Sequence, residues 1–402
     1  MSRKYVFGIL IVVLIGLGIC LYYTQFNEPE PERILDPTYW EDEYPAIFKT
    51  YARDSNLGYV KFGGEQQIDY IKKYPNIKTL YAGYGFSKEY FEARGHIHTL
   101  EDVNEIGRPK GGASCLACKT AEYEGLYQEY GDKLYSMDFD ETADKLEYPI
   151  TCYNCHENNP GTININVPHA LAGFDKLDFD IKSGTKGCAQ CHVEYYVNPE
   201  NKEIIFPWDE GITIADYEKY YDDINHTDWE HPDTGTPLIK IQHPEFEMYQ
   251  DSVHDKQDMS CKDCHMPSVE NKEGEEFVSH WMTSPLKTAK ESCFSCHGYN
   301  YDSEEKFVEW VNDKQQKIED KEVQTSNLLV KFVEDFSTKL EEEKLDEETI
   351  EELRSLHRSA QMHWDFIFAE NSTGSHNFER ANEYLDKAQE LSKEGLNILA
   401  NY

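Results

Sequence analysis

Cys115-Leu116-Ala117-Cys118-Lys119 is the first of five cysteine motifs around which this chain is expected to fold. It differs from the other four in its last residue. Those four read Cys-x-x-Cys-His and end at His156, His192, His265 and His297. This pattern is the attachment site of a c-type haem, in which two thiols bind the porphyrin and the imidazole binds the iron. A lysine in the last position supplies an amine ligand once it is deprotonated. The first haem is therefore predicted to differ from the other four.

Cysteine usage supports five attachment sites. Ten of the eleven cysteines lie in the motifs: Cys115, Cys118, Cys152, Cys155, Cys188, Cys191, Cys261, Cys264, Cys293 and Cys296. Zinc knuckles or a disulfide framework also use spaced cysteines, but neither needs a ligand directly after every second cysteine. For the lysine motif, a degenerate haem site or a simple thiol pair stays open as an alternative. The eleventh cysteine, Cys20, lies in an N-terminal apolar run.

The composition predicts a fold organised around haems. The chain has 402 residues, of which only 39% are hydrophobic, and its mean hydropathy is −0.72. Porphyrin faces can replace much of an apolar side-chain core. The first cysteines of successive motifs lie 37, 36, 73 and 32 residues apart, so tandem identical modules are not expected. We expect a mainly α multihaem cytochrome c fold with little β-structure.

The N-terminal segment 1–27 is predicted to be a transmembrane anchor or a signal segment. Residues 5–23 form an uncharged run of about the length that spans a bilayer. Arg3 and Lys4 precede it and acidic residues follow, which places the remainder on the extracytoplasmic side. No Ala-x-Ala cleavage site follows, and the residues before Cys20 match a lipoprotein box only loosely. We favour an anchor, with the protein at the outer face of the cytoplasmic membrane (periplasm or cell exterior).

Charge excludes nucleic acid as a partner. The net charge is −37, and since the first 27 residues carry +2, the remainder carries −39. Residues 28–45 are rich in proline and glutamate and are predicted to form an acidic tether. Residues 46–402 are predicted to form a pentahaem catalytic domain.

The C-terminal part, residues 304–402, is predicted to consist of long amphipathic helices over 304–345, 346–370 and 377–399. Asp346 is expected to cap the second helix, and Gly374-Ser375 to separate the last two. These helices either cover the haem core only or also form a homodimer interface.

A count of iron ligands indicates where the chemistry lies. Five haems have ten axial positions, and the motifs supply five ligands: Lys119, His156, His192, His265 and His297. Electron-transfer haems take a second protein ligand, which leaves no room for substrate. Eleven further histidines are enough for four such ligands. One open iron at Lys119, fed by four closed haems, is typical of an oxidoreductase with an internal electron path.

The order of motifs resembles the pentahaem ammonia-forming cytochrome c nitrite reductases over essentially the whole exported chain. That family has Cys-x-x-Cys-Lys first and four Cys-x-x-Cys-His motifs after it. It also has Glu-Tyr after the third motif, here Glu194-Tyr195, and Lys-x-Gln-His before the fourth, here Lys240-Ile241-Gln242-His243. The resemblance implies six-electron reduction of nitrite to ammonium at the lysine-ligated haem.

Carried over residue by residue, the resemblance implies an active-site triad of Arg108, Tyr195 and His243. Arg94 competes with Arg108 because the spacing of this arginine varies. An imidazolium at His243 would donate protons near neutral pH. The resemblance also implies one Ca²⁺, held by the Glu194 carboxylate, the Gln242 side-chain amide and the backbone carbonyls of Tyr195 and Lys240.

The distal histidines are implied in the same way. His280 is assigned to the second-motif haem, His96 to the third, His376 to the fourth and His254 to the fifth. His357 and His363 are alternatives to His376. The remaining histidines, His98, His169, His226 and His231, are expected to be structural or solvated.

The resemblance further implies a membrane multihaem quinol dehydrogenase as electron donor, nitrite as substrate and a homodimer. Two alternatives remain at this level. One is a pure electron-transfer protein whose lysine haem is closed, and the other is a related enzyme acting on hydroxylamine or sulfite.

Overall fold

The computed structural model describes residues 33–402 apart from 57, 59 and 63–66. The predicted anchor or signal segment 1–27 therefore lies outside the described residues. None of the described helices has the length and apolar character needed to cross a membrane. The chain divides into two compact units, and the larger is Leu35–Tyr402. Residues 35–45 of the predicted tether belong to this larger unit, where Trp40 is buried.

The larger unit is mainly helical, as predicted. Its α-helices are α2 (Pro45–Tyr51), α3 (Tyr70–Lys73), α4 (Ile77–Leu80), α5 (Thr99–Glu105), α6 (Tyr123–Tyr130), α7 (Phe139–Ala143), α8 (Tyr153–His156), α9 (Pro168–Phe174), α10 (Ser183–Ala189), α11 (Ile214–Asp223), α12 (Glu245–Tyr249), α13 (Cys261–His265), α14 (Ala289–Ser292), α15 (Phe294–His297), α16 (Glu304–Glu341), α17 (Glu347–Ala369) and α18 (Phe378–Leu399). Short 3₁₀ turns are η1 (Pro37–Trp40), η2 (Ala52–Ser55), η3 (Gly85–Ser87), η4 (His96–His98), η5 (Ala113–Leu116), η6 (Gly131–Ser136), η7 (Asp255–Gln257) and η8 (Pro285–Thr288).

The described β-structure consists of three small antiparallel pairs. They are β1 (Tyr196–Val197) with β2 (Ile204–Ile205), β3 (Trp229–Glu230) with β4 (Pro237–Leu238), and β5 (Ser268–Glu270) with β6 (Glu276–Val278). Such pairs are too small to build a core, so the architecture depends on helices and loops.

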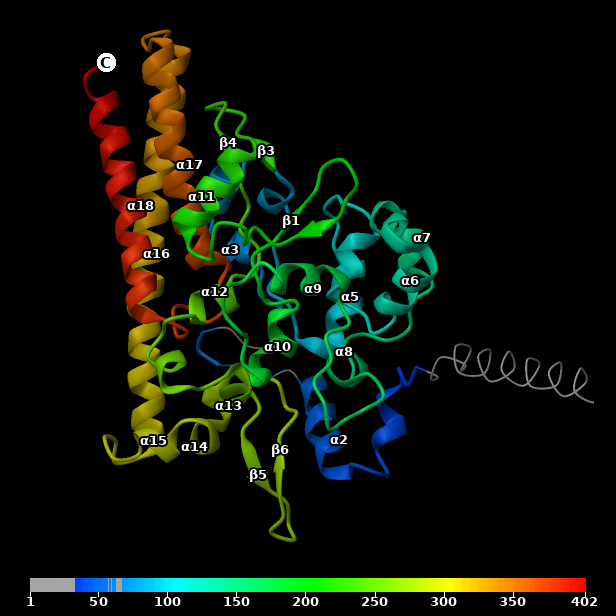
Figure 1. The fold of residues 1–402 in the computed structure, drawn as a ribbon. Coiled ribbons are helices and arrows are strands. Elements are labelled where there is room, and N and C mark those ends of the chain that lie inside the picture. The colour runs from blue at the N-terminus through cyan, green and yellow to red at the C-terminus, as the bar shows by residue number, and fades with distance from the viewer. Residues whose placement is uncertain (1–32, 57, 59, 63–66) are drawn as a thin grey trace, which may run out of the picture. The chain divides into compact units, whose positions relative to one another are not determined.

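Three long helices, α16, α17 and α18, pack side by side (Figure 1). Local signals fix their ends. Asp346 accepts a hydrogen bond from the Thr349 amide and caps α17 as predicted, because a side-chain oxygen satisfies one of the free amides of the first turn. Gly374 lies in the connection between α17 and α18, at the position where the sequence predicts the break. Its φ of +80° is a turn conformation that glycine adopts readily.

The contact between α16 and α18 depends on a glycine. Gly395 in α18 lies against Phe332 of α16, and a Cβ at position 395 would lie 2.2 Å from Phe332 Cζ. Phe332 is fully buried beside Phe336 and Leu399, so its ring has little room to move. The missing Cβ therefore allows these two helices to approach closely.

Gly395→Ala is expected to destabilise the protein by a net ~1–2 kcal/mol, because overpacking outweighs the gain of ~1 kcal/mol in helix propensity. Urea unfolding of the holoprotein measures this. Glu394→Ala, one residue earlier and exposed, is the control and should change the free energy of unfolding by less than ~0.5 kcal/mol. A Gly395→Ala protein as stable as the wild type would contradict the tight packing.

Four of the five motifs form one helical turn. The backbone amides of His156, His192 and His297 donate to the carbonyl four residues earlier, at 2.9–3.0 Å, and α13 contains the fourth-motif histidine. This spacing places the first cysteine and the histidine on the same helix face. The lysine motif differs, because the Lys119 amide donates to Leu116, three residues earlier, at 3.0 Å.

Candidate functional site

Histidines that are distant in the sequence face one another in four pairs. The ring centroids of His156 and His280 lie 6.1 Å apart, as do those of His96 with His192 and of His254 with His297. His265 and His376 lie 6.2 Å apart. Each pair joins one motif histidine to the distal histidine that the sequence assigned to the same haem.

The spacing fits two imidazoles that bind one metal ion from opposite sides. Metal–imidazole bonds are about 2 Å long, and a ring centre lies ~1.1 Å behind its nitrogen, so two ligands in line have centroids roughly 6.3 Å apart. Direct ring stacking or a hydrogen bond between rings has no reason to repeat this separation four times. The residues therefore fit four six-coordinate haems.

Several of these rings use Nδ1 for an outer hydrogen bond. The acceptors are the Thr162 carbonyl for His156 at 2.8 Å, the Thr283 carbonyl for His265 at 3.0 Å, the Val278 carbonyl for His280 at 3.0 Å and the Glu370 carboxylate for His376 at 2.5 Å. Such partners fix the tautomer with Nδ1–H and leave Nε2 for the metal.

The cysteine alternatives are not supported. All ten motif cysteines are free thiols in the structure. Within the described ranges, His, Cys, Asp and Glu side chains do not gather in threes around a point that a single metal ion could share.

Two of the predicted catalytic residues are electrostatically coupled to the lysine motif. Lys119 is among the groups that lower the pKa of His243. The Tyr195 hydroxyl lies within electrostatic range of Cys115, Cys118 and Arg108, and burial raises its pKa well above the usual value. These couplings link Arg108 and Tyr195, and separately His243, to the first motif, and a cation, a phenol and an imidazole are groups that suit an anionic substrate that takes up protons.

The structure separates the two candidate arginines. Arg94 is engaged in ion pairs with Asp102 at 2.5 Å and Glu101 at 3.0 Å. Arg108 packs over the Phe86 ring, with its Cζ 4.0 Å from the centroid, and donates weakly to the Glu89 carbonyl at 3.4 Å. For Arg108, no carboxylate ion pair is present among the described residues. Arg108 is therefore the arginine whose charge is available to a ligand.

His243 differs from the sequence-based expectation. Burial lowers its pKa to about 4, the charge of Glu245 opposes this, and the charges of Lys119, His192 and Lys240 add to the lowering. The imidazole is therefore neutral at pH 7 rather than cationic. Sequence alone predicted a cation because it does not reveal the desolvation or the neighbouring positive groups.

The four predicted calcium ligands lie close together. The Glu194 carboxylate is fully buried and accepts hydrogen bonds from the Gln242 amide at 2.6 Å and the Tyr221 hydroxyl at 2.9 Å. The Gln242 side-chain amide donates a hydrogen bond from Nε2 to the Lys240 carbonyl, at 3.0 Å. Burial, Glu247 and Asp228 raise the pKa of Glu194 well above its usual value. Oxygen donors around a buried carboxylate fit a hard cation such as Ca²⁺.

The Lys240 side chain points away from this group of oxygens. Its Nζ pairs with Asp365 of α17 at 2.9 Å, and both groups are buried. Asp365 also accepts from the Ile241 amide at 3.0 Å. The buried ion pair therefore holds the segment 240–242 by its backbone, which leaves the Lys240 carbonyl as that residue's possible metal ligand.

The other histidines have structural surroundings. His231 and His357 are fully buried, and His357 Nδ1 bonds Thr236 at 2.9 Å. His226 packs on Tyr196, with ring centroids 4.5 Å apart. Burial lowers the pKa of His357 to about 3, so it stays neutral. His98, His169 and His363 are also outside the four pairs, and His169 is buried.

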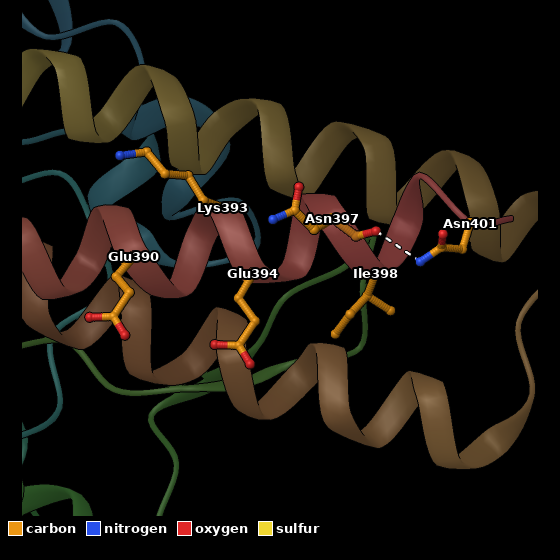
Figure 2. A pocket seen from close by; sticks show the side chains of 6 residues that line it. All are labelled: Glu390, Lys393, Glu394, Asn397, Ile398 and Asn401. Carbon is orange, nitrogen blue, oxygen red and sulfur yellow. Dashed lines mark hydrogen bonds between the residues drawn. The ribbon is translucent and has the colours of Figure 1, made fainter.

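A surface hollow on α18 lies apart from this chemistry. Figure 2 shows that it is lined by Glu390, Lys393, Glu394, Asn397, Ile398 and Asn401. The Asn401 amide bonds the Asn397 carbonyl at 3.1 Å, so the end of the helix satisfies its own polar groups. This hollow contains no motif cysteine or ligand histidine.

A family model described as cytochrome c552 matches residues 36–401. The chain belongs to the cytochrome c552 family. Curated relatives agree: the cytochrome c-552 of Bacteroides thetaiotaomicron is 31% identical over 360 residues, which are 84% of this chain and 71% of the relative. The cytochrome c-552 of Porphyromonas gingivalis is 31% identical over 355 residues, and the match covers 84% of this chain and 70% of the relative. A c-type cytochrome carries covalently attached haem, in agreement with the motifs and the histidine pairs.

A solved structure resembles this cytochrome c552 family member over most of its length. It is the catalytic subunit of the cytochrome c nitrite reductase from Desulfovibrio desulfuricans, with a TM-score of 0.83 and 28% identity. The match covers 91% of this chain and 86% of the other. Two calcium sites are described for that protein.

Sequence reasoning missed several carboxylates of this cytochrome site. Glu245 lies 3.7 Å from His192 Nδ1, Glu370 bonds His376, and Glu247 accepts from the Glu194 amide at 2.9 Å. Glu245 and Glu247 follow His243 so closely that their position was a usable signal. Glu370 had none, because acidic residues are common throughout the chain.

Proposed function

We propose that this protein reduces nitrite to ammonium at a lysine-ligated c-type haem fed by four bis-histidine haems. The reaction is NO₂⁻ + 6 e⁻ + 8 H⁺ → NH₄⁺ + 2 H₂O. Each haem would be attached through the cysteines of one motif, and Lys119 would hold the reactive one. That haem, when bound, supplies the open iron at which nitrite is held and receives electrons.

The observation that carries the proposal is the four facing histidine pairs in a chain whose remaining motif ends in lysine. The electrostatic influence of Arg108 on Tyr195 and of Lys119 on His243 supports a common site for these residues. Four closed sites can pass electrons, and one site with acidic and cationic groups can use them. The similarity to a solved nitrite reductase supports the same activity.

The chain's own residues divide the work at the site. Arg108 offers a guanidinium without a carboxylate partner among the described residues, which suits a nitrite oxygen. Tyr195 offers a hydroxyl that stays protonated, because burial raises its pKa. His243 begins neutral and accepts a proton once negative charge accumulates beside it, and it then donates that proton to the substrate.

One Ca²⁺ held by Glu194, Gln242 and the carbonyls of Tyr195 and Lys240 is part of the proposal. The ion would offset the buried charge of Glu194 and fix the direction of the adjacent Tyr195.

Glu194→Gln is expected to reduce bound calcium from about one ion per chain to almost none and to lower nitrite reduction at least ~tenfold. Metal analysis of the purified protein and a nitrite assay measure the two effects. Glu200→Gln, an exposed position with the same change in charge, is the control and should retain both. Full calcium content in Glu194→Gln would remove this residue from the ligand set.

Product analysis tests the function directly. With a reduced viologen as electron donor, each nitrite consumed should yield one ammonium without free nitric oxide. Electron paramagnetic resonance of the oxidised protein should contain a high-spin ferric signal that changes when nitrite is added. Only low-spin signals indifferent to nitrite, with no ammonium formed, would instead support an electron carrier.

The proposal includes the surroundings of the enzyme. Electrons would come from a membrane multihaem quinol dehydrogenase, and the segment 1–27 would hold the enzyme at the extracytoplasmic face of the membrane. The long helices α16 to α18 would form a homodimer interface. Crosslinking and sedimentation of the full chain would measure the association.

A further inference from the structure

The outer partners of the histidine pairs are not equivalent. In the pair His156–His280, both Nδ1 atoms meet backbone carbonyls, which are neutral acceptors. In the pair His265–His376, one Nδ1 meets a carbonyl and the other meets the Glu370 carboxylate at 2.5 Å. The fourth-motif site therefore has an anionic partner that the second-motif site lacks.

Glu370 is a fixed, buried anion. Its side chain is 0% exposed, and besides His376 it accepts hydrogen bonds from the Ser372 amide at 3.2 Å, the Ser372 hydroxyl at 2.9 Å and the Gly374 amide at 3.3 Å. These hydrogen bonds fix the direction of the carboxylate. The residue lies directly after α17, and Gly374, with a φ of +80°, lies between it and His376 in the connection to α18.

We propose that Glu370 lowers the reduction potential of the fourth-motif haem by holding Nδ1–H of His376. A carboxylate that accepts this proton gives the imidazole anionic character and makes it a stronger donor to a ferric ion. The oxidised state is thereby stabilised relative to the reduced state. The couple takes up one electron from the donor chain, and the proton stays on His376.

The neighbouring residue ties this site to the third-motif pair. The Asn371 side-chain amide donates to Glu245, and Glu245 lies 3.7 Å from His192 Nδ1. This second carboxylate contact is longer than a hydrogen bond, so its effect is expected to be smaller. Glu370 is thus the outer partner of His376, and Asn371 contacts Glu245 beside His192, so carboxylates would lower the potentials of the third- and fourth-motif haems.

The inference rests on the proposed haem ligation, and the test separates the two. Wild-type holoprotein is titrated potentiometrically, with electron paramagnetic resonance following each low-spin signal. His376→Ala identifies the fourth-motif haem as the low-spin signal that becomes high-spin. A wild type without bis-histidine signals would refute the proposed function itself.

In Glu370→Gln, the reduction equilibrium of that one haem should shift at least ~tenfold toward the reduced state, which corresponds to ~59 mV for one electron. Its g-values should change as well, because the donor strength of His376 changes. Glu370→Asp keeps the charge but retracts the carboxylate, and it should shift the equilibrium in the same direction. Glu370→Asp also tests the inference if the glutamine variant fails to incorporate haem.

Asp263→Asn is the matched control. Asp263 lies inside the fourth motif and caps α13 through Ser260, without contact to either histidine Nδ1, and asparagine retains the cap. The control should shift the equilibrium less than ~threefold and leave the g-values unchanged, since it removes only a partly exposed charge. The inference would be overturned if the reduction equilibrium of this haem were unchanged in Glu370→Gln, or if it shifted equally in Asp263→Asn.

Discussion

Replacing Arg108 by lysine or alanine should lower kcat/KM for nitrite, and the alanine variant should lose about a hundred- to a thousandfold. That loss is the usual result of removing one group that stabilises a developing oxyanion. The guanidinium packs on Phe86 and lacks a carboxylate partner among the described residues, so its charge is directed to a ligand. Lysine keeps the charge but loses the planar pair of donors, and it should restore only part of the rate.

The control for Arg108 is the competing arginine. Arg94→Lys can keep its ion pair with Asp102, because a point charge satisfies that carboxylate. Steady-state nitrite reduction by Arg94→Lys should stay close to wild type, and haem content should be unchanged in both variants. A larger loss in Arg94→Lys than in Arg108→Lys would reassign the catalytic arginine.

Much of the fold followed from local signals. The long C-terminal helices were predicted within a few residues because their apolar positions repeat with helical period, and because Asp346 and Gly374 mark ends that side-chain and backbone chemistry dictate. The small amount of β-structure was predicted because the low hydrophobic content and the haem motifs indicated a core organised around porphyrins rather than a sheet. The acidic tether was less well placed, since residues 35–45 join the compact unit through contacts that composition does not encode.

The candidate site was predictable in residue type but not in environment. Motif spacing and family resemblance named both members of each histidine pair, and the structure places them face to face. The carboxylates behind them come from elements far apart in the chain, so no local pattern reveals them. The protonation state of His243 could not be predicted for the same reason, because its pKa depends on burial and on Lys119, Lys240 and Glu245.

Two buried carboxylates with opposite pKa shifts illustrate this dependence on environment. Burial raises the pKa of Glu247 to about 8, although hydrogen bonds from the Glu194 amide, Trp208 and Tyr217 act in the opposite direction. Burial would also raise the pKa of Glu245, but the contact with the His192 imidazole outweighs it and lowers the pKa to about 2. Both belong to the five-residue helix α12, and sequence distance alone would treat them alike.

His243→Asn should lower kcat for nitrite reduction by about a hundred- to ten-thousandfold, the usual range for loss of a general acid. Eight protons must reach one nitrogen and two oxygens. Burial raises the pKa of Tyr195 well above its usual value, whereas the pKa of His243 is about 4, so His243 is the one of these two residues that can exchange protons repeatedly. Asparagine keeps a polar group of similar size, so binding of nitrite should change much less than turnover. Haem content and the low-spin spectra should stay as in wild type.

The pH dependence of this variant tests the role more sharply than the rate. With a pKa of about 4, the protonated fraction of His243 in the free enzyme rises about tenfold for each pH unit between 7 and 5. Since kcat/KM reports the free enzyme, it should keep rising as pH falls through 6.5, and this slope should be absent in His243→Asn. A bound Ca²⁺ nearby would depress the pKa further and preserve the slope. A plateau below pH 6.5 in wild type would instead mean that His243 is already cationic, as its residue type alone suggests, and that the desolvation seen around it is relieved in the working enzyme.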